Sequence, residues 1–246
     1  MNAKPLQVAA ASALLAALHF AVAAAAAGAA VASTAPVERT ATVLVATVFD
    51  RYLAGLATLR SEFTQTSTDS RGRAQPPLSG TLLISRPGRF RWEIRSSASA
   101  VATTQLMVAD GRNVWFYDRE LEQVTVRGAD AALTATPAML LSGGVDPHAA
   151  FDIRAGARVA GLDTVLVKPL RADAEFRQAT LSFSGAELKR MSIVDKLGQT
   201  TTLQFTKSIR NGAVNPAELV FTPPPGVDVI GTPLAVAASP DSSTKR

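Results

Sequence analysis

Apolar and charged residues alternate along residues 89–95 with a period of two. The apolar members of this pattern are Phe90, Trp92 and Ile94. Such alternation is typical of a half-buried antiparallel strand. A second apolar stretch ends just before Pro87-Gly88, a pair that bends or ends a strand. The pattern therefore predicts two strands that meet near Arg86, which is placed at a corner beside apolar surface.

Two stretches of the sequence predict helices. From residue 41 to residue 60, apolar residues recur every three or four positions, which is the stripe of an amphipathic helix. The stripe consists of Val45, Phe49, Tyr52, Leu56 and Leu59. Residues 136–143 begin with a threonine and a proline and end with a glycine, which predicts one short helix. Because two apolar turns are not stable alone in water, this helix has to lie on apolar surface.

The rest of the chain predicts strands joined by turns. The expected strands are 64–68, 78–84, 106–109, 113–117, 122–127, 158–159, 164–168, 179–184, 188–195 and 199–209. Asp110-Gly111 is a strong hairpin signal, because these residues tolerate the positive backbone angles of a tight turn. The proline-broken segment 221–230 suits the edge of a sheet. The sequence therefore predicts a mostly antiparallel sheet with one apolar and one wet face.

The two ends of the chain differ from its middle. Residues 1–32 hold one lysine and a long apolar run with small residues at its end, which predicts a signal peptide cleaved after Ala32, or otherwise an uncleaved anchor. Residues 33–231 form one expected domain, and 232–246 an expected disordered tail. The full chain carries a net charge of +5. Since the charges alternate in sign along the chain, nucleic acid is not an expected partner.

The sequence offers little for catalysis. It contains no cysteine, so it can form neither a disulfide nor a lipid anchor on a cysteine after the signal peptide. His148 is the only histidine after residue 32, and neither a G-x-S-x-G motif nor a metal-ligand pattern accompanies it. Nucleotide-binding glycine motifs are absent. Four acidic residues lie in or beside turns and are expected to be solvated there: Asp110, Asp118, Glu120 and Glu122. We therefore expect no enzyme, no cofactor and no metal site.

Five blocks of sequence, in order, carry a family resemblance. They are LATLRSEFTQ, SGTLLISRPGRFRW, DGRNVWFYDRELEQVTV, TPAMLLSG and NGAVNPAELVFTPPPGVDVI. On these blocks the chain resembles the periplasmic outer-membrane lipoprotein carriers, the LolA family, over nearly all of its length after residue 32. The resemblance implies a mainly β fold: an unclosed antiparallel half-barrel of about eleven strands, with an α-helical lid over an apolar cavity.

The resemblance also implies a function. Members of the family are monomeric periplasmic carriers that take triacylated lipoproteins from an inner-membrane ABC transporter and pass them to an outer-membrane receptor. Arg86 matches the family arginine whose guanidinium bonds lid carbonyls and holds the cavity shut, and the pattern match places those carbonyls around 140–142. Phe90 matches a loop aromatic linked to partner engagement and transfer. The expected cavity lining is Leu53, Leu56, Leu59, Trp92, Met139 and Leu140.

Several alternatives remain open on the sequence. The same elements could enclose a filled core without a ligand, because periodicity does not distinguish a core from a lidded cavity. A related scaffold could carry another lipid or hydrophobic ligand in a dedicated envelope pathway. An exported hydrolase would have to use His148. The extra basic residue Arg89 after the proline and the long polar tail leave the partner's identity open.

Overall fold

The structure is a computed structural model of the 246-residue chain. It describes residues 46–95, 103–129, 137–144, 146–172, 174 and 176–235. The predicted signal peptide, the first part of the predicted helix 41–60 and most of the predicted tail lie outside these residues. Within the described ranges, no helix has the length and apolar character needed to span a bilayer.

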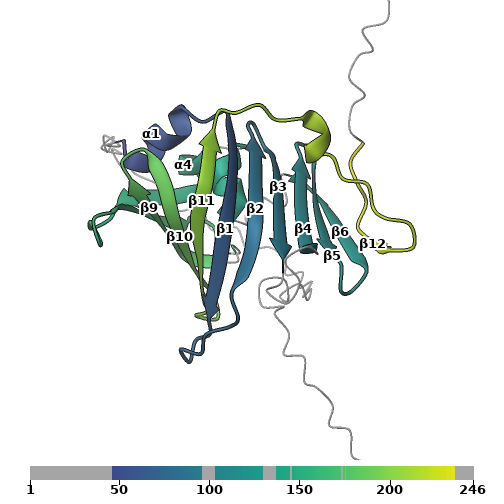
Figure 1. The fold of residues 1–246 in the computed structure, drawn as a ribbon, viewed down its shortest axis with the longest axis horizontal. Coiled ribbons are helices and arrows are strands. Elements are labelled where there is room, and N and C mark those ends of the chain that lie inside the picture. The colour runs from purple at the N-terminus through teal and green to yellow at the C-terminus, as the bar shows by residue number, and fades with distance from the viewer. Residues whose placement is uncertain are drawn as a thin grey trace, which may run out of the picture. The chain divides into compact units, whose positions relative to one another are not determined.

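Among the described residues, twelve strands form a single sheet, whose arrangement Figure 1 shows. They are β1 Thr58–Thr68, β2 Leu78–Ser85, β3 Arg89–Arg95, β4 Thr103–Asp110, β5 Asn113–Asp118, β6 Gln123–Gly128, β7 Phe151–Ala155, β8 Asp163–Pro169, β9 Phe176–Ser184, β10 Glu187–Asp195, β11 Thr200–Arg210 and β12 Asp228–Ile230. Their order is β12-β6-β5-β4-β3-β2-β1-β11-β10-β9-β8-β7. The predicted unclosed, mostly antiparallel sheet is therefore confirmed, with twelve strands in place of about eleven.

The predicted edge segment agrees with the structure, and one predicted strand does not. The segment 221–230 ends in β12, which pairs in parallel with β6 and forms the sheet edge, as its prolines indicated. The strand predicted at 158–159 is wrong, since only an isolated bridge joins Val159 to Leu162. The real strand is β7, where Phe151 and Ile153 alternate with charged residues and are buried. The same alternation is present in the sequence, but it covers only five residues and is too short to predict a strand.

The helices within the described ranges are short. They are α1 Val48–Ala54, α3 Pro137–Ser142, α4 Pro147–Ala150 and the 3-10 helix η1 Pro216–Leu219. A capping box fixes the start of α1, because the side chain of Thr47 accepts from the backbone of Asp50 and that of Asp50 accepts from Thr47. The predicted helix is wrong beyond Ala54. From Thr58 onward, buried and exposed side chains alternate with a period of two. These residues form strand β1, although Leu59 also fits the spacing of the predicted helix.

One face of the sheet, which we call the inner face, carries the main apolar cluster. Its central contact is between the rings of Phe63 and Trp92, whose centroids are 4.7 Å apart. Gly80 lies on the neighbouring strand β2, and any Cβ there would overlap the Phe63 ring and the carbonyl of Glu93. α1 and α3 add Phe49, Tyr52, Leu53, Ala138, Leu140 and Leu141 to the same cluster. The two helices therefore cover this face.

The opposite, outer face is apolar only on part of the sheet. On β4, β5 and β6 it carries a second cluster: Leu106, Val108, Trp115, Tyr117, Val124 and Val126. Phe221 covers this cluster, with its ring centroid 5.8 Å from that of Trp115. The predicted wet face is therefore wrong for these three strands, where the chain after η1 shields a second core.

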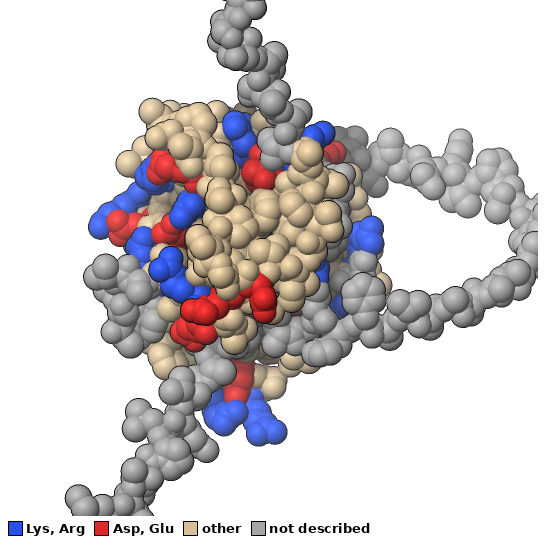
Figure 2. All heavy atoms as spheres, turned by 90° about the vertical axis from the view of Figure 1, so that its right-hand side faces the viewer, with Lys and Arg blue, Asp and Glu red and all other residues tan. Residues whose placement is uncertain are grey.

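The β12 edge of the sheet presents uncharged surface. Figure 2 views this side, with Lys, Arg, Asp and Glu around an uncharged centre. The exposed large apolar residues of this region are Leu121, Val229, Ile230 and Leu234. The backbone of Leu234 bonds the side chain of Asn113 through both its N–H and its carbonyl. The backbone as far as Leu234 is therefore attached to the start of β5.

Candidate functional site

Arg86 lies in the turn between β2 and β3, at the corner that the sequence indicated. Its Nη1 donates to the carbonyl of Leu53 at 2.5 Å and to that of Leu56 at 3.4 Å. The predicted acceptors around 140–142 are wrong. The carbonyl of Ser142 accepts from the backbone N–H of Gly88 at 2.8 Å, whereas Arg86 bonds the end of α1.

Arg86 also touches the end of α3, by packing rather than by a hydrogen bond. Gly143 follows α3 with a φ of +69°, and a Cβ at this position would overlap the Arg86 guanidinium. The glycine therefore lets the guanidinium lie against the backbone, and it provides the left-handed conformation that commonly ends a helix. Arg86 is thus in contact with the ends of both covering helices.

Replacing Gly143 by alanine is expected to lower the free energy of unfolding by about 1–3 kcal/mol and to displace Arg86. Urea unfolding would measure the first effect, and binding of a hydrophobic dye the second. Gly161→Ala is the matched control, because Gly161 has a φ of +77° with no atom within 4 Å of its added Cβ. Equal losses in the two variants would show that backbone strain alone, and not the contact with Arg86, explains the effect.

The six predicted lining residues come together in the inner-face cluster. Leu53 and Leu56 come from α1 and the chain just after it, Leu59 and Trp92 from β1 and β3, and Met139 and Leu140 from α3. All are buried except Met139, which is partly buried. They fill the space between the sheet and the two helices, so an apolar ligand that entered here would displace the helices first.

Phe90 is not where the resemblance suggested. It lies in β3 rather than in a loop, and its side chain is fully buried in the inner-face cluster. In this structure Phe90 therefore offers no surface to a partner, and its role in partner engagement and transfer stays a prediction. Its alternation with charged neighbours, already evident in the sequence, is the signal of a buried strand position.

Two polar residues at the end of β11 contact α1 from another direction, and neither is predicted from the sequence. Arg210 donates from Nη2 to the carbonyl of Tyr52 at 2.9 Å, and its guanidinium carbon lies 4.5 Å from the Tyr52 ring centroid. Asn211 donates from Nδ2 to the carbonyl of Gly55 at 2.8 Å. Burial raises the pKa of Tyr52 to about 12, although the charge of Arg210 opposes this. The only sequence signal was Asn-Gly after a long strand, which indicates a turn.

His148 contributes a contact between helices. Its Nε2 lies 2.7 Å from Oδ1 of Asp50, so α4 is bonded to α1. Burial opposes ionisation of Asp50, but the hydrogen bonds from His148 and Thr47 outweigh it and lower the pKa of Asp50. In the described part of the chain, no group of three or more His, Cys, Asp and Glu could hold a metal. The geometry gives His148 and Asp50 a structural role.

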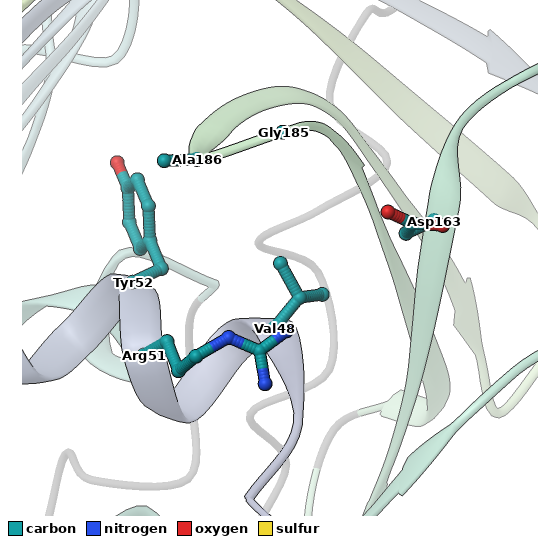
Figure 3. Close-up of a pocket in the computed structure, with 6 residues that line it drawn as sticks. All are labelled: Val48, Arg51, Tyr52, Asp163, Gly185 and Ala186. Carbon is teal, nitrogen blue, oxygen red and sulfur yellow. The ribbon is translucent and has the colours of Figure 1, made fainter.

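A pocket of about 370 Å³ opens beside α1 (Figure 3). Its lining residues are Val48, Arg51, Tyr52, Asp163, Gly185 and Ala186. Figure 3 shows Tyr52 and Arg51 rising from α1, Gly185 and Ala186 in the turn between β9 and β10, and Asp163 across from them on β8. The pocket therefore lies between α1, the β9–β10 turn and β8.

Comparison with known proteins identifies the family. The model of the family described as "Outer membrane lipoprotein carrier protein LolA" matches residues 54–222. The chain belongs to the LolA family. The LolA match includes Arg86, α3 and the Arg210-Asn211 pair, and it ends beside Phe221 on the outer face.

Curated LolA relatives match over most of their length. A protein named outer-membrane lipoprotein carrier protein from Dechloromonas aromatica is 41% identical, over 73% of this chain and 84% of the relative. A protein of the same name from Bordetella pertussis is 37% identical, over 86% of this chain and 93% of the relative. A crystal structure of a LolA superfamily protein from Nitrosomonas europaea matches with a TM-score of 0.44 and 7% identity, over 73% of this chain and 99% of that chain.

Proposed function

We propose that this chain is a periplasmic carrier that binds the acyl chains of lipoproteins released from the inner membrane and delivers them to an outer-membrane receptor. The observation that carries the proposal is the construction of the inner face. An open sheet presents a large apolar surface there, and α1 and α3 cover it with Arg86 in contact with both helix ends. The names of the LolA relatives support the same role.

A carrier is needed because acyl chains cannot cross water unaided. At about 0.8 kcal/mol per buried methylene, exposing one chain of about sixteen carbons costs on the order of 12 kcal/mol. The inner-face residues can replace that water with apolar contacts. Extraction needs energy from outside the carrier, which fits an inner-membrane ABC transporter as donor. Delivery then needs only a receptor that binds the acyl chains more tightly.

The covering helices are suited to move. α3 has six residues and α1 has seven, and isolated helices of this length are not stable in water. Their position therefore depends on contacts with the sheet and with Arg86. In the proposed cycle, cargo separates α3 from the sheet, and Leu53, Leu56, Leu59, Trp92, Met139 and Leu140 contact acyl chains. Arg86 closes the cover again after release, acting as a latch.

The remaining parts of the proposal concern the chain's setting. Residues 1–32 act as a cleaved signal peptide that directs export to the periplasm, and residues 33–231 form the carrier domain. Residues 232–246 follow as a tail whose start is bonded to Asn113 at Leu234. The carrier works as a monomer, without catalysis and without a cofactor. Phe90 takes part in transfer only in a state where the cover has moved, because its side chain is buried here.

Mass spectrometry of molecules that co-purify with the tagged protein from the periplasm tests this proposal. We expect diverse triacylated lipoproteins, enriched in Arg86→Leu because a cover without its latch accepts cargo and releases it poorly. Arg89→Leu is the matched control, since it removes one positive charge from the start of β3, beside the same turn, and the side chain of Arg89 bonds Ser85 and not α1. Recovery of one free lipid would instead indicate a dedicated lipid carrier. Recovery of nothing with any variant would indicate a closed core.

A further inference from the structure

We propose that Arg210 and Asn211 form a second clamp, which keeps α1 attached to the sheet while α3 moves. The cover of the inner face would then open at α3, with α1 as its fixed part. This inference rests on the proposed carrier function for its purpose. Its structural content is independent of cargo and can be tested without any.

The first support is the set of acceptors at the end of α1. The last carbonyls of a helix have no partner within the helix and bind donors from elsewhere. Arg210 occupies the carbonyl of Tyr52, and Asn211 occupies that of Gly55. Arg86 occupies those of Leu53 and Leu56. The helix end is therefore held from two places in the sheet, the β2–β3 turn and the end of β11.

Asn211 is held firmly enough to act as an anchor. Its Oδ1 accepts from the backbone N–H groups of Ala57 at 2.8 Å and Thr58 at 3.3 Å. Its own N–H donates to the carbonyl of Thr58 at 2.8 Å. With a φ of +56°, Asn211 has the left-handed conformation that asparagine tolerates better than most residues. One side chain thus joins the end of β11 to the connection between α1 and β1.

Arg210 spans from α1 to the β9–β10 turn. Its Nη1 donates to the carbonyl of Ala186 at 3.3 Å, while Nη2 donates to Tyr52. Among the described residues, Arg210 Nε is the one buried side-chain N or O atom without a hydrogen-bond partner. The unpaired Nε costs free energy. The guanidinium is held by its stacking on the Tyr52 ring and by the two carbonyls. A planar guanidinium can make these three contacts at once, whereas a lysine ammonium cannot.

The pocket beside α1 lies next to this clamp. Tyr52 and Ala186 both line it. The Tyr52 ring also packs on that of Phe183 in β9, with the ring centroids 5.5 Å apart. Arg210 crosses from the carbonyl of Tyr52 to that of Ala186 and adds a polar connection to this apolar contact.

The two clamps differ in what they join. Arg86 contacts both α1 and Gly143 at the end of α3. Arg210 and Asn211 join α1 to the β9–β10 turn and to the start of β1. α3 itself lies over β2 and β3, while α1 lies over β8. Loss of the Arg86 contacts therefore separates α3 from α1 but leaves the second clamp on α1 intact.

Hydrogen exchange of the cargo-free mature chain, read by mass spectrometry, tests the inference. Arg210→Leu is expected to raise the exchange rate of α1 amides about tenfold and that of α3 amides less than twofold, because α1 loses one hydrogen bond and the stacking on Tyr52. Arg86→Leu is expected to show the reverse preference, with the larger rise in α3. Arg177→Leu is the control, since Arg177 donates to a backbone carbonyl at Asp195 on the same sheet, away from α1.

The inference is overturned if Arg210→Leu leaves exchange in α1 within twofold of wild type, or if Arg86→Leu raises exchange in α1 as much as in α3. Should Arg210→Leu fail to fold, Asn211→Gly is judged by the same criterion, because glycine keeps the left-handed backbone and removes only the side chain. Altered exchange in α1 together with no lipoprotein in the co-purification would retain the clamp and reject the carrier. The opposite pair of results would retain the carrier and reject the clamp.

Discussion

Replacing Phe63 by alanine is expected to lower the free energy of unfolding by about 3–5 kcal/mol. The Phe63 side chain is only 2% exposed and lies at the centre of the inner face, against Trp92 and with the Phe205 ring 6.4 Å away. Gly80 leaves room for the Phe63 ring. Because glycine has no side chain, nothing at position 80 can extend into the space that Phe63→Ala would leave. The neighbours can therefore relax only in part, and most of the volume of the ring remains as a cavity.

Urea unfolding at pH 7 measures this effect through the midpoint, with the slope as a check that both states keep their compactness. Leu121→Ala is the control, because Leu121 is 70% exposed and its truncation should change the free energy of unfolding by less than about 0.5 kcal/mol. A loss below about 1 kcal/mol for Phe63→Ala would mean that the centre of the inner face is loosely packed, as an empty cavity would be.

Replacing Asp110 by alanine is expected to cost about 2–4 kcal/mol at pH 7, because it leaves buried donors without a partner. The carboxylate accepts from Trp115 Nε1 at 2.9 Å and from the backbone N–H groups of Arg112 at 2.8 Å and Asn113 at 2.7 Å. Asn113 is fully buried, and Trp115 is only 8% exposed. Asp110→Asn keeps an acceptor of the same shape, so it should lose less.

The stabilisation by Asp110 should also depend on pH. Burial opposes its ionisation, but the hydrogen bonds from Trp115, Asn113 and Arg112 outweigh it, so the pKa of Asp110 lies below its usual value. A carboxylate with a lowered pKa stabilises the fold above its unfolded pKa of about 3.9, and this contribution disappears as the pH falls through the folded pKa. The gap in unfolding free energy between wild type and Asp110→Asn should therefore shrink below about pH 4. A gap that stays constant down to pH 2 would contradict this role.

Local patterns predicted the elements whose partners are close in sequence. The alternation of residues 89–95 gave β3, and the Asp110-Gly111 turn gave the β4–β5 hairpin. The helical stripe failed after Ala54, since Leu56 and Leu59 satisfy both a helical spacing and burial beside a strand. Only the pairing of β1 with β2 and β11 decides between the two.

The polar contacts of the candidate site could not be predicted in the same way. Arg86 was placed at its corner from Pro87-Gly88, but the identity of its acceptors depends on how α1 and α3 lie over the sheet. Arg210 and Asn211 reach Tyr52 and Gly55 across more than 150 residues of sequence. Asp110 was expected to be solvated, as most turn acids are, but the turn brings it next to Trp115. Such contacts follow from tertiary packing, which periodicity does not encode.

The pairing of β1 with β11 affects the folding of the chain during its synthesis. β1 pairs with β2 from residue 58 onward, but its other neighbour, β11, begins only at Thr200. Until that residue has been synthesised and has emerged, the strand destined for the middle of the sheet has an open edge. An open edge beside apolar residues such as Phe63 is a site of unwanted strand pairing. The nascent chain therefore stays prone to aggregation until its last fifth is available.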